Sequence, residues 1–443
     1  MPFELPSSFA SLLSLFRPCF TQPTFQTFCA LAVGLLARVR GRTVTGMLAA
    51  AGLAGEWHHS RAHRFFSRAR WSVDRLGLAA LVLVATRLLE EGDPLLVAVD
   101  DTLIKRYGPK VFGRHLNYDG SSVAGGPKSM RTAWGNSWVV AGAVVELPFL
   151  ERAVCLPILF RLWRPGEGPT QVELACELVA VIAAADPGRR LVVLADGAYA
   201  GSALAPEKLP RNVTLVLRAR RDVRLYRPPP RRRKGQMGRP RLKGKAFASL
   251  REQAAGGALW RRAEVRAYGE RQTVETIEQR GLWWSAWRAA RVKAVALRDR
   301  RAPDQIDLVL ICSDPKLSPA SIVELYARRW AIEVAFRDAK QLVGVGEAQN
   351  RTRRAVERTA PFGFLCLTLA ILWYALAGHS AADVGERRRR SPWYLAKRHP
   401  SVEDMLVKLR RSVIAARVSA SMGPRASTRK LADLAEAWEM AAA

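Results

Sequence analysis

Leu95–Leu103 (LLVAVDDTL) is a short apolar run with two carboxylates, Asp100 and Asp101, close to its end. Its length and its β-branched residues predict a buried strand rather than a helix. Leu191–Leu194 (LVVL) predicts a second buried strand, which runs into Asp196. A glycine follows that aspartate and lets backbone or substrate approach closely. Each of these two strands therefore presents an acidic side chain at its end.

The elements around these strands alternate between sheet and helix. We expect strands at Trp138–Val145, Val154–Leu162 and Val213–Leu217, and helices at Thr170–Ala185 and Ser202–Leu209. The first three strands of the chain are joined as hairpins and the later ones alternate with helices. That order predicts a mixed α/β sheet with helices packed on it. Strand-like segments resume between residues 263 and 311, so further β structure is expected there.

Helices are expected at both ends of the chain. Residues 1–90 read as apolar helices, and within residues 55–72 aromatic side chains alternate with arginines. This alternation fits DNA contact and equally fits an ordinary amphipathic helix with a solvated arginine face. Ser318 and Pro319 form a typical helix start, and that helix should run to about residue 343. Residues 380–443 are basic and helical in pattern.

The charge of the chain indicates its partner. Its 443 residues include 70 basic and 39 acidic ones, a formal net charge of +31. The hydrophobic fraction of 49% is enough for a packed core, so this charge belongs to a folded protein. A GC-rich genome would explain many arginines but not the shortage of acidic residues. Nucleic acid is therefore the expected partner.

The most basic segment is residues 218–245, which also contains three consecutive prolines. Such a composition cannot form a core, so we expect an exposed basic arm. The arm residues expected to contact phosphates are Arg231, Arg232, Arg233, Lys234, Arg239 and Arg241. The short motif at residues 238–240 (GRP) also resembles arms that insert arginine into the minor groove, but a general phosphate contact is preferred.

The cysteines and one apolar segment bear on the cellular location. Six cysteines are scattered without a CxxC pair, which argues against a zinc ribbon or a disulfide scaffold and fits a reducing cytoplasm. The N-terminus lacks the pattern of a signal peptide. Residues 360–378 carry no charge and are long enough to span a bilayer. We expect a buried helix there, because charged sequence flanks it on both sides; a membrane anchor is the alternative.

Tyr326, Arg329, Glu333, Arg337 and Lys340 are separated by three, four, four and three positions. On one continuous helix they would form a single stripe, in which cations grip phosphates while the glutamate holds metal. Carboxylates far apart in sequence but convergent in space are what a pair of Mg²⁺ ions requires. Taken singly, each acid could equally be a turn, cap or surface residue.

The spacing Tyr326-x2-Arg329-x3-Glu333-x6-Lys340 matches the YREK signature of DDE transposases of bacterial insertion sequences. VAVDDT (residues 97–102) and LADGAY (residues 194–199) resemble the two aspartate blocks of that family. From about residue 90 to about residue 345, the chain is similar to DDE-superfamily endonuclease transposases with a β-rich insertion. The resemblance implies an RNase H-like core, two Mg²⁺ ions that Mn²⁺ can replace, and cut-and-paste transposition.

Carried over by position, the resemblance makes Asp101, Asp196 and Glu333 the catalytic metal ligands. It also implies DNA contacts near the cleaved phosphate from Tyr326, Arg329 and Lys340, with Arg337 on the same stripe. In the first block we prefer Asp101, which stands directly before the threonine. Asp100 should point to the opposite strand face and is the alternative. One of Trp283, Trp284 and Trp287 is expected to stack on an extruded base, with a hairpin core as the equal alternative.

These expectations divide the chain into a helical DNA-binding region (1–90), a catalytic core (91–220 and 318–378), a basic arm with a β-rich insertion (221–317), and a basic helical region (379–443). The expected partner is double-stranded DNA, as transposon ends and target, bound by a homodimer in a synaptic complex. We expect no membrane and a place in the bacterial cytoplasm, at the nucleoid. A catalytically silent, transposase-derived DNA-binding or regulatory protein is the alternative, against which the intact acids argue.

Overall fold

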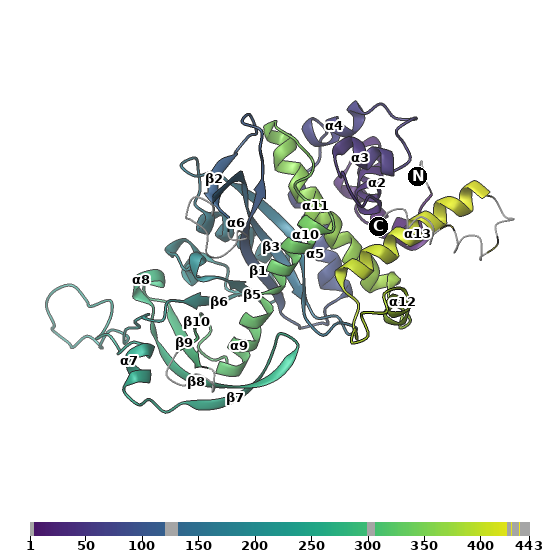
Figure 1. The fold of residues 1–443 in the computed structure, drawn as a ribbon. Coiled ribbons are helices and arrows are strands. Elements are labelled where there is room, and N and C mark those ends of the chain that lie inside the picture. The colour runs from purple at the N-terminus through teal and green to yellow at the C-terminus, as the bar shows by residue number, and fades with distance from the viewer. Residues whose placement is uncertain (1–3, 120–131, 299–305, 423–426, 428–433, 435–443) are drawn as a thin grey trace.

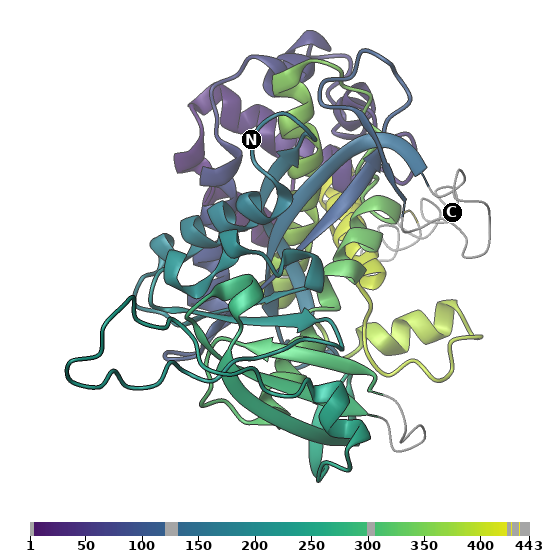
Figure 2. The ribbon, with the colours of Figure 1, turned by 90° about the vertical axis from the view of Figure 1, so that its left-hand side faces the viewer.

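A computed structural model describes residues 4–119, 132–298 and 306–422, together with residues 427 and 434. These residues form one large mixed sheet of ten strands with helices packed against it (Figure 1). The N-terminal helices lie at one end of the molecule and residues 250–298 lie at the other, as the view turned by 90° also shows (Figure 2).

The strands are β1 (Leu95–Lys105), β2 (His115–Tyr118), β3 (Thr132–Val145), β4 (Val154–Trp163), β5 (Leu191–Ala195), β6 (Val213–Ala219), β7 (Arg261–Ala267), β8 (Glu270–Leu282), β9 (Arg291–Arg298) and β10 (Leu308–Cys312). Their order is β2-β3-β1-β5-β6-β10-β9-β8-β7, and β4 also pairs with β3. β1, β5 and β6 are parallel neighbours, whereas β4, β3 and β1 pair in antiparallel fashion. This is the strand order of an RNase H-like core, so the predicted mixed α/β fold is confirmed.

The helices are α1 (Ser7–Ser14), α2 (Gln22–Ala37), α3 (Val44–Ala50), α4 (Ser60–Ser67), α5 (Val73–Arg87), α6 (Gln171–Ala185), α7 (Leu250–Ala255), α8 (Trp284–Trp287), α9 (Pro319–Arg328), α10 (Ala331–Gln341), α11 (Arg353–Trp373), α12 (Asp383–Arg390) and α13 (Val402–Met422). Ser318 caps α9 by accepting a hydrogen bond from the Ser321 backbone, as predicted. Thr170 and Glu173 form a capping box at the start of α6, which lies between β4 and the parallel strand β5.

Neighbouring side chains of β4 reveal which helices cover which face of the sheet. Phe160 stacks on Phe364 of α11, with ring centroids 5.6 Å apart. The next residue, Arg161, bonds to Asp74 of α5 and to Glu177 of α6 at 2.9 and 2.8 Å. Successive side chains of a strand point to opposite faces. Therefore α11 and its neighbour α10 cover one face, and α5 and α6 cover the other.

Helix α11 contains the uncharged segment at residues 360–378 and continues into a π-helical turn at Tyr374–Gly378. It is long and apolar enough to cross a membrane, but 83% of its apolar window is buried inside the protein. It packs against β4, α4, α5 and α13, as the views in Figure 1 and Figure 2 agree. The expectation of a buried core helix therefore fits the structure.

Phe362→Ala should destabilise the protein by about 3–5 kcal/mol, the usual cost of removing a fully buried phenylalanine. Its ring packs edge-on against Phe28, Phe65 and Phe66, at centroid distances of 6.1, 5.8 and 5.3 Å. Denaturant unfolding measures the loss. Leu376→Ala is the control, because this side chain is 41% exposed and should cost little. Equal losses for the two variants would contradict this packing.

The helix predicted from residue 318 to about residue 343 is in fact two helices. α9 ends at Arg328 and α10 begins at Ala331. Across the junction the backbone forms tighter bonds to the third residue back, Arg329 N to Tyr326 O at 3.0 Å and Glu333 N to Trp330 O at 3.1 Å. Arg329 and Trp330 keep right-handed helical backbone angles, and Arg329 still contacts Glu333 four residues on, so the stripe continues across this tighter turn. No glycine or proline marks this break in the sequence.

Two other segments differ from the sequence prediction. The expected helix at Ser202–Leu209 forms two short 3₁₀ turns, Ser202–Leu204 and Pro206–Lys208, because proline cannot donate the bond that would continue a helix. The basic arm starts later than residue 218, since β6 continues to Ala219 and an isolated bridge between Tyr226 and Ala246 closes the arm at its base. Beyond the bridge, the loop projects from the body in Figure 1 and Figure 2.

Candidate active site

The ends of β1 and β5 bring two aspartates together. The parallel register pairs Val99 with Ala195, so the next residues, Asp100 and Asp196, lie side by side at one edge of the sheet. Glu333 is in the first turn of α10, which contacts β1. α9 contacts β5 and β6 and leads into the same region. Three acids that are far apart in the sequence therefore approach one another from two neighbouring strands and a helix.

The sheet register separates Asp100 from Asp101. Asp100 is opposite Val140, and Val140 is opposite Phe160, whose side chain faces α11. Asp101 is opposite Val139, and Val139 is opposite Arg161, whose side chain faces α5 and α6. Glu333 is on α10, so Asp100 shares its side of the sheet. Asp100, the alternative, therefore lies on the side of Glu333, whereas the charge of Asp196 acts on Asp101, the aspartate preferred from the sequence. The choice of Asp101 stays a prediction.

Arg329 connects two of the acids. Its Nη1 lies 2.9 Å from Asp100 Oδ2 and its Nη2 lies 2.6 Å from Glu333 Oε1. Both contacts are charge-assisted hydrogen bonds, the stronger class of such bonds. The residue is only 9% exposed. The sequence predicted a DNA phosphate contact for this side chain; in the structure it is paired with Asp100 and Glu333.

Tyr326 connects α9 to the third acid. Its hydroxyl donates to Asp196 Oδ1 over 3.4 Å, and the Arg329 guanidinium lies 5.5 Å from the centre of its ring. Burial raises the pKa of Tyr326 to about 12, so the hydroxyl keeps its proton and remains a donor at neutral pH. Two residues around the end of α9 thus contact all three acids.

Asp101 faces the other side of the sheet, and burial and the nearby negative charge of Asp196 both raise the pKa of its carboxyl. The hydroxyl of Tyr199 donates to Asp101 Oδ1 over 3.4 Å. Tyr199 belongs to the short 3₁₀ turn Gly197–Tyr199 that directly follows Asp196. Asp101 also lines a cavity of about 260 Å³ with the loop before α6. Its contact with Tyr199 therefore ties the turn after Asp196 to β1, a role that the sequence did not indicate for Tyr199.

Burial changes the acidity of both β1 aspartates. It raises the pKa of Asp100 to about 7, although the positive charge of Arg329 opposes the shift. It also raises the pKa of Asp101, against the lowering effect of hydrogen bonds from Tyr199 and Gln171. A carboxylate that is costly to ionise in isolation gains from a nearby cation. The region is thus suited to binding positive charge.

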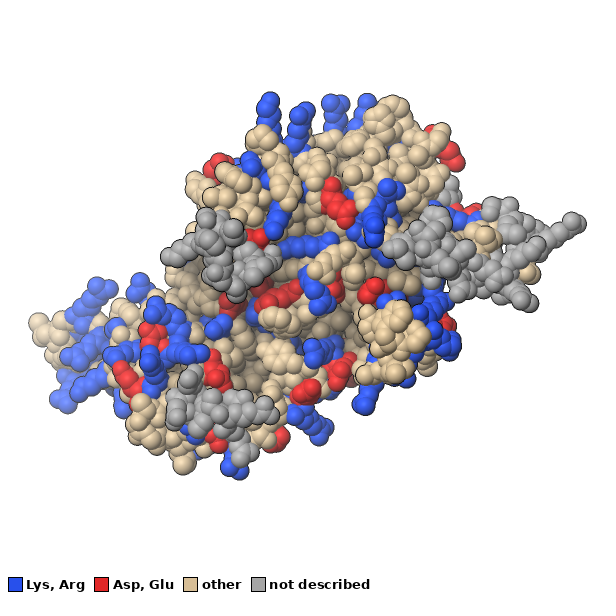
Figure 3. All heavy atoms as spheres, in the orientation of Figure 1, with Lys and Arg blue, Asp and Glu red and all other residues tan. Residues whose placement is uncertain are grey.

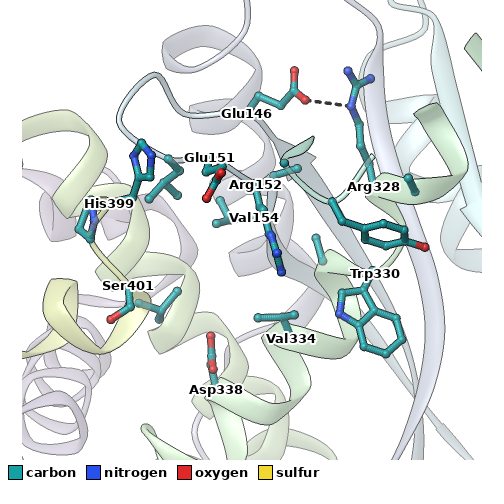
Figure 4. A pocket seen from close by; sticks show the side chains of 18 of the residues that line it. Glu146, Glu151, Arg152, Val154, Arg328, Trp330, Val334, Asp338, His399 and Ser401 are labelled. Carbon is teal, nitrogen blue, oxygen red and sulfur yellow. Dashed lines mark hydrogen bonds and ion pairs between the residues drawn. The ribbon is translucent and has the colours of Figure 1, made fainter. Parts of the chain in front are cut away.

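The remaining residues of the predicted stripe lie further away. Arg337 pairs with Asp338, at 2.9 Å between Nη2 and Oδ1, and lines a cavity of about 370 Å³ on another side of α10. Figure 4 shows this cavity, with Trp330, Val334 and Asp338 on one side and His399 and Ser401 on the other. Within the described residues, the ion pair of Arg337 is with its neighbour Asp338 and not with one of the three acids.

Lys340 is in the last turn of α10, partly buried near the end of β1. Burial lowers the pKa of its ammonium group, while nearby Asp119 acts in the opposite direction. Asp119 is also paired with Lys105, the last residue of β1, at 2.7 Å. Lys340 is thus on the side of α10 that faces the sheet, as a phosphate contact beside Glu333 would require.

A wide groove begins at Asp196 and leads to the base of the basic arm. Its cavity is about 870 Å³. The basic and aromatic residues that line it are Arg218, Arg220, Arg221, Arg224, Tyr226 and Trp283. The sequence did not single out Arg218, whose exposed side chain lies on β6 beside β5. Arg218 reaches the groove only because β6 lies beside β5, and the sequence does not show which strands are neighbours.

The three tryptophans of the insertion have different environments. Trp287 is completely buried and Trp283 is 6% exposed, with their rings 5.1 Å apart. Trp284 is half-buried beneath Lys243 and Arg288, at 5.1 and 5.8 Å from its ring centre. Trp287 therefore serves the hairpin core, whereas Trp283 borders the groove that contains Asp196.

Basic side chains gather over the arm at one side of the face shown in Figure 3. All six of its predicted phosphate contacts are exposed: Arg231, Arg232, Arg233, Lys234, Arg239 and Arg241. In the N-terminal region, by contrast, Phe65 and Phe66 are buried and Arg61 stacks on Trp57 at 3.5 Å. The aromatic residues at 55–72 thus belong largely to the helical core.

The donor atoms of the three acids fit a hard divalent cation. Asp100, Asp196 and Glu333 offer carboxylate oxygens, the ligands that Mg²⁺ prefers together with water. As they stand, the described residues include no group of three acidic, histidine or cysteine side chains arranged to hold a metal ion. Instead, the guanidinium of Arg329 lies between one oxygen of Asp100 and one of Glu333.

The chain matches one family model, described as DDE superfamily endonuclease, over residues 15–282. No curated protein matches the chain. The matched range is well over half of the 443 residues and includes Asp100, Asp101 and Asp196, whereas the helix that carries Glu333 follows it. The strand order and the acids at the strand ends agree with this match. The chain therefore belongs to the DDE superfamily of endonucleases, a family of nucleases that act on DNA with divalent metal ions.

Proposed function

We propose that the protein is a transposase that binds the ends of an insertion sequence and performs the cleavage and strand transfer of cut-and-paste transposition. The observation that carries the proposal is the convergence of Asp100, Asp196 and Glu333 at one edge of an RNase H-like sheet. The family match supports the nuclease class. The YREK spacing around Glu333 supports the insertion-sequence group.

Asp100, Asp196 and Glu333 are the proposed ligands of two Mg²⁺ ions, which Mn²⁺ can replace. Such ions activate a water molecule or a 3′-hydroxyl and stabilise the leaving oxygen. Asp100 takes the place expected for Asp101 from the sequence, because it shares the face of Glu333. Asp101 acts through Tyr199, holding the turn that positions Asp196.

The protein's own residues bind and orient the DNA. The groove beside Asp196 offers Arg218 and its neighbours to successive phosphates, and the basic arm extends this contact. Lys340 approaches the same region from α10. Trp283, which borders the groove, and Trp284, which is the most exposed of the three, are the proposed candidates for a base platform, whereas Trp287 is fully buried.

Changing the six exposed basic residues of the arm between positions 231 and 241 to glutamine should weaken DNA binding and its salt dependence. Each phosphate that is no longer neutralised lowers the slope of log affinity against log salt by about 0.9, so the slope should fall by up to about five. Dissociation constants measured at several salt concentrations give the slope. The base of the arm stays intact, since Arg227 N still donates to Lys245 O. An unchanged slope would place the arm away from DNA.

Metal affinity should rise with pH up to about 7 and then level off, because a metal ion competes with the proton on Asp100. Burial raises the pKa of this carboxyl to about 7, so below that pH the protonated form dominates. Mn²⁺ titrations between pH 5.5 and 8.5 should give about a tenfold gain per pH unit on the acid side. Asp100→Asn should remove this dependence. A flat profile for the wild type would exclude Asp100 as a ligand that loses a proton.

The alternative is a catalytically silent DNA-binding or regulatory protein derived from a transposase. Incubating the full-length protein with DNA that carries the flanking ends of its own coding region, in Mg²⁺ or in EDTA, separates the two. Nicks at the ends and joined products in Mg²⁺ alone are expected. Specific binding without cleavage would favour the regulator. A homodimer that pairs two ends, at the nucleoid of the bacterial cytoplasm, completes the proposal.

A further inference from the structure

The guanidinium of Arg329 lies where a metal ion would have to compete for ligands. It contacts one oxygen of each carboxylate, Asp100 Oδ2 at 2.9 Å and Glu333 Oε1 at 2.6 Å. The side chain of Arg329 is only 11% exposed, and those of Asp100 and Glu333 are 17% and 34% exposed. This is an interior cation shared by two acids from different elements, and not a surface ion pair.

The two acids need such a cation. Carboxylates that approach each other away from water repel, and an opposite charge between them offsets that cost. A divalent ion would serve the same purpose with the same oxygens. Both cations cannot hold these oxygens at once, since they repel each other and the ligand atoms are shared. The other oxygen of Asp100, Oδ1, accepts a hydrogen bond from the Asp101 backbone. Metal binding to Asp100 and Glu333 therefore competes with Arg329.

The surroundings of Arg329 provide a destination for its guanidinium. The residue sits at the junction of α9 and α10, with its guanidinium 5.5 Å from the ring centre of Tyr326, whose hydroxyl donates to Asp196 at the start of the groove. Within the described residues, its buried Nε–H has no hydrogen-bond acceptor. A phosphate in the groove could offer oxygens to this donor and to the Nη groups, a geometry that guanidinium forks match well. DNA could thus satisfy Arg329 better than the two acids do.

We propose that Arg329 is a built-in counter-cation of the metal site, which a DNA phosphate draws away so that metal binding and DNA binding are coupled. This inference rests on the proposed function of the three acids. Without DNA, the arginine neutralises Asp100 and Glu333 and weakens metal binding. With DNA, the guanidinium moves to phosphate and the freed oxygens bind metal. By linkage, metal raises DNA affinity by the same factor as DNA raises metal affinity.

The test is the binding of Mn²⁺ alone to the full-length protein, followed by the electron paramagnetic resonance signal of the free ion. For the wild type, a short DNA duplex should increase Mn²⁺ affinity at least about tenfold. For Arg329→Gln, Mn²⁺ should bind at least about tenfold more tightly than to the wild type without DNA, and DNA should add little. The same factor should appear in the DNA affinity of the wild type with and without Mn²⁺.

Arg328→Gln is the matched control. It makes the same change of charge one residue away, but Arg328 pairs with Glu146 at 3.0 Å on the side of the cavity shown in Figure 4. Its Mn²⁺ affinity without DNA should equal that of the wild type. Arg329→Lys is a second variant in case the glutamine variant does not fold. A compact ammonium cannot span both carboxylates, so this variant should also bind Mn²⁺ more tightly than the wild type.

Two results would overturn the proposal at different levels. If Arg329→Gln and Arg329→Lys, folded by circular dichroism, bind Mn²⁺ no more tightly than the wild type without DNA, Arg329 is not a counter-cation. Glu333→Gln tests the underlying site, because it should lose Mn²⁺ affinity with and without DNA. If Glu333→Gln binds Mn²⁺ as the wild type does, the proposed metal site fails, and with it the proposed function. A weaker Glu333→Gln together with unchanged Arg329 variants refutes the counter-cation alone.

Discussion

Glu333→Gln should lower the rate of metal-dependent DNA cleavage by about a thousandfold or more. Glutamine keeps the size of the side chain and one oxygen for Arg329, but it removes the negative charge that a divalent ion needs. Loss of transition-state stabilisation worth several kcal/mol corresponds to three or more powers of ten in rate. Single-turnover cleavage of end-bearing DNA in Mg²⁺ measures the effect. DNA affinity measured in EDTA should stay within a few-fold of the wild type.

Glu324→Gln is the control for this prediction. Glu324 is on α9, one helix away, and accepts a hydrogen bond from the Arg266 backbone at 2.8 Å. A glutamine oxygen can accept the same bond, so structure and cleavage rate should be kept. If Glu333→Gln cleaved at the rate of Glu324→Gln, the glutamate would have no part in the chemistry.

Asp100→Asn and Asp101→Asn should differ strongly in their effects. Asp100 shares the face of Glu333, so its replacement should reduce cleavage by about a thousandfold or more, as expected for a metal ligand. Asp101 accepts a hydrogen bond from Tyr199, and in the proposed supporting role its loss should cost a factor of about 10–100. Single-turnover rates in Mg²⁺ and Mn²⁺ affinities of both variants measure the difference.

Tyr199→Phe is the partner variant for Asp101. It removes only the hydroxyl that donates to Asp101 Oδ1. If Asp101 works by holding the turn after Asp196, Tyr199→Phe should show a similar, moderate reduction in rate, and the double variant should be little slower. An inactive Asp101→Asn together with an active Asp100→Asn would restore the assignment made from the sequence.

Much of the core could be predicted because its signals are local. Short β-branched runs mark β1 and β5, and Asp196 directly follows its strand. The capping box of α6 and the Ser318 cap each depend on residues only three positions apart in the sequence. A strand end places an acid at the edge of a sheet whatever the rest of the fold. For these reasons the sequence could predict that acids stand at the ends of β1 and β5.

The choice between Asp100 and Asp101 could not be made in this way. Alternation predicts that neighbouring side chains face opposite sides, but not which side α10 covers. That side follows from the packing of α11 on Phe160 and of α5 and α6 on Arg161, contacts between residues far apart in the chain. The position directly before the threonine favoured the other aspartate.

The tighter turn between α9 and α10 could not be predicted from the sequence either. Residues 326–333 include no glycine or proline, so helical spacing predicted one stripe. The tighter turn at Arg329 places its guanidinium between Asp100 and Glu333, one acid from the sheet and one from the next helix. The groove beside Asp196 likewise depends on β6 lying next to β5, which is a result of strand order.

The most direct measurement is the position of Mn²⁺ in crystals of the protein bound to DNA, located by the anomalous scattering of the metal. We expect Mn²⁺ in contact with the carboxylates of Asp100, Asp196 and Glu333, next to a DNA phosphate, with the Arg329 guanidinium moved away from Asp100. Mn²⁺ bound on the opposite face of the sheet, at Asp101 and Tyr199 and without Glu333, would contradict it.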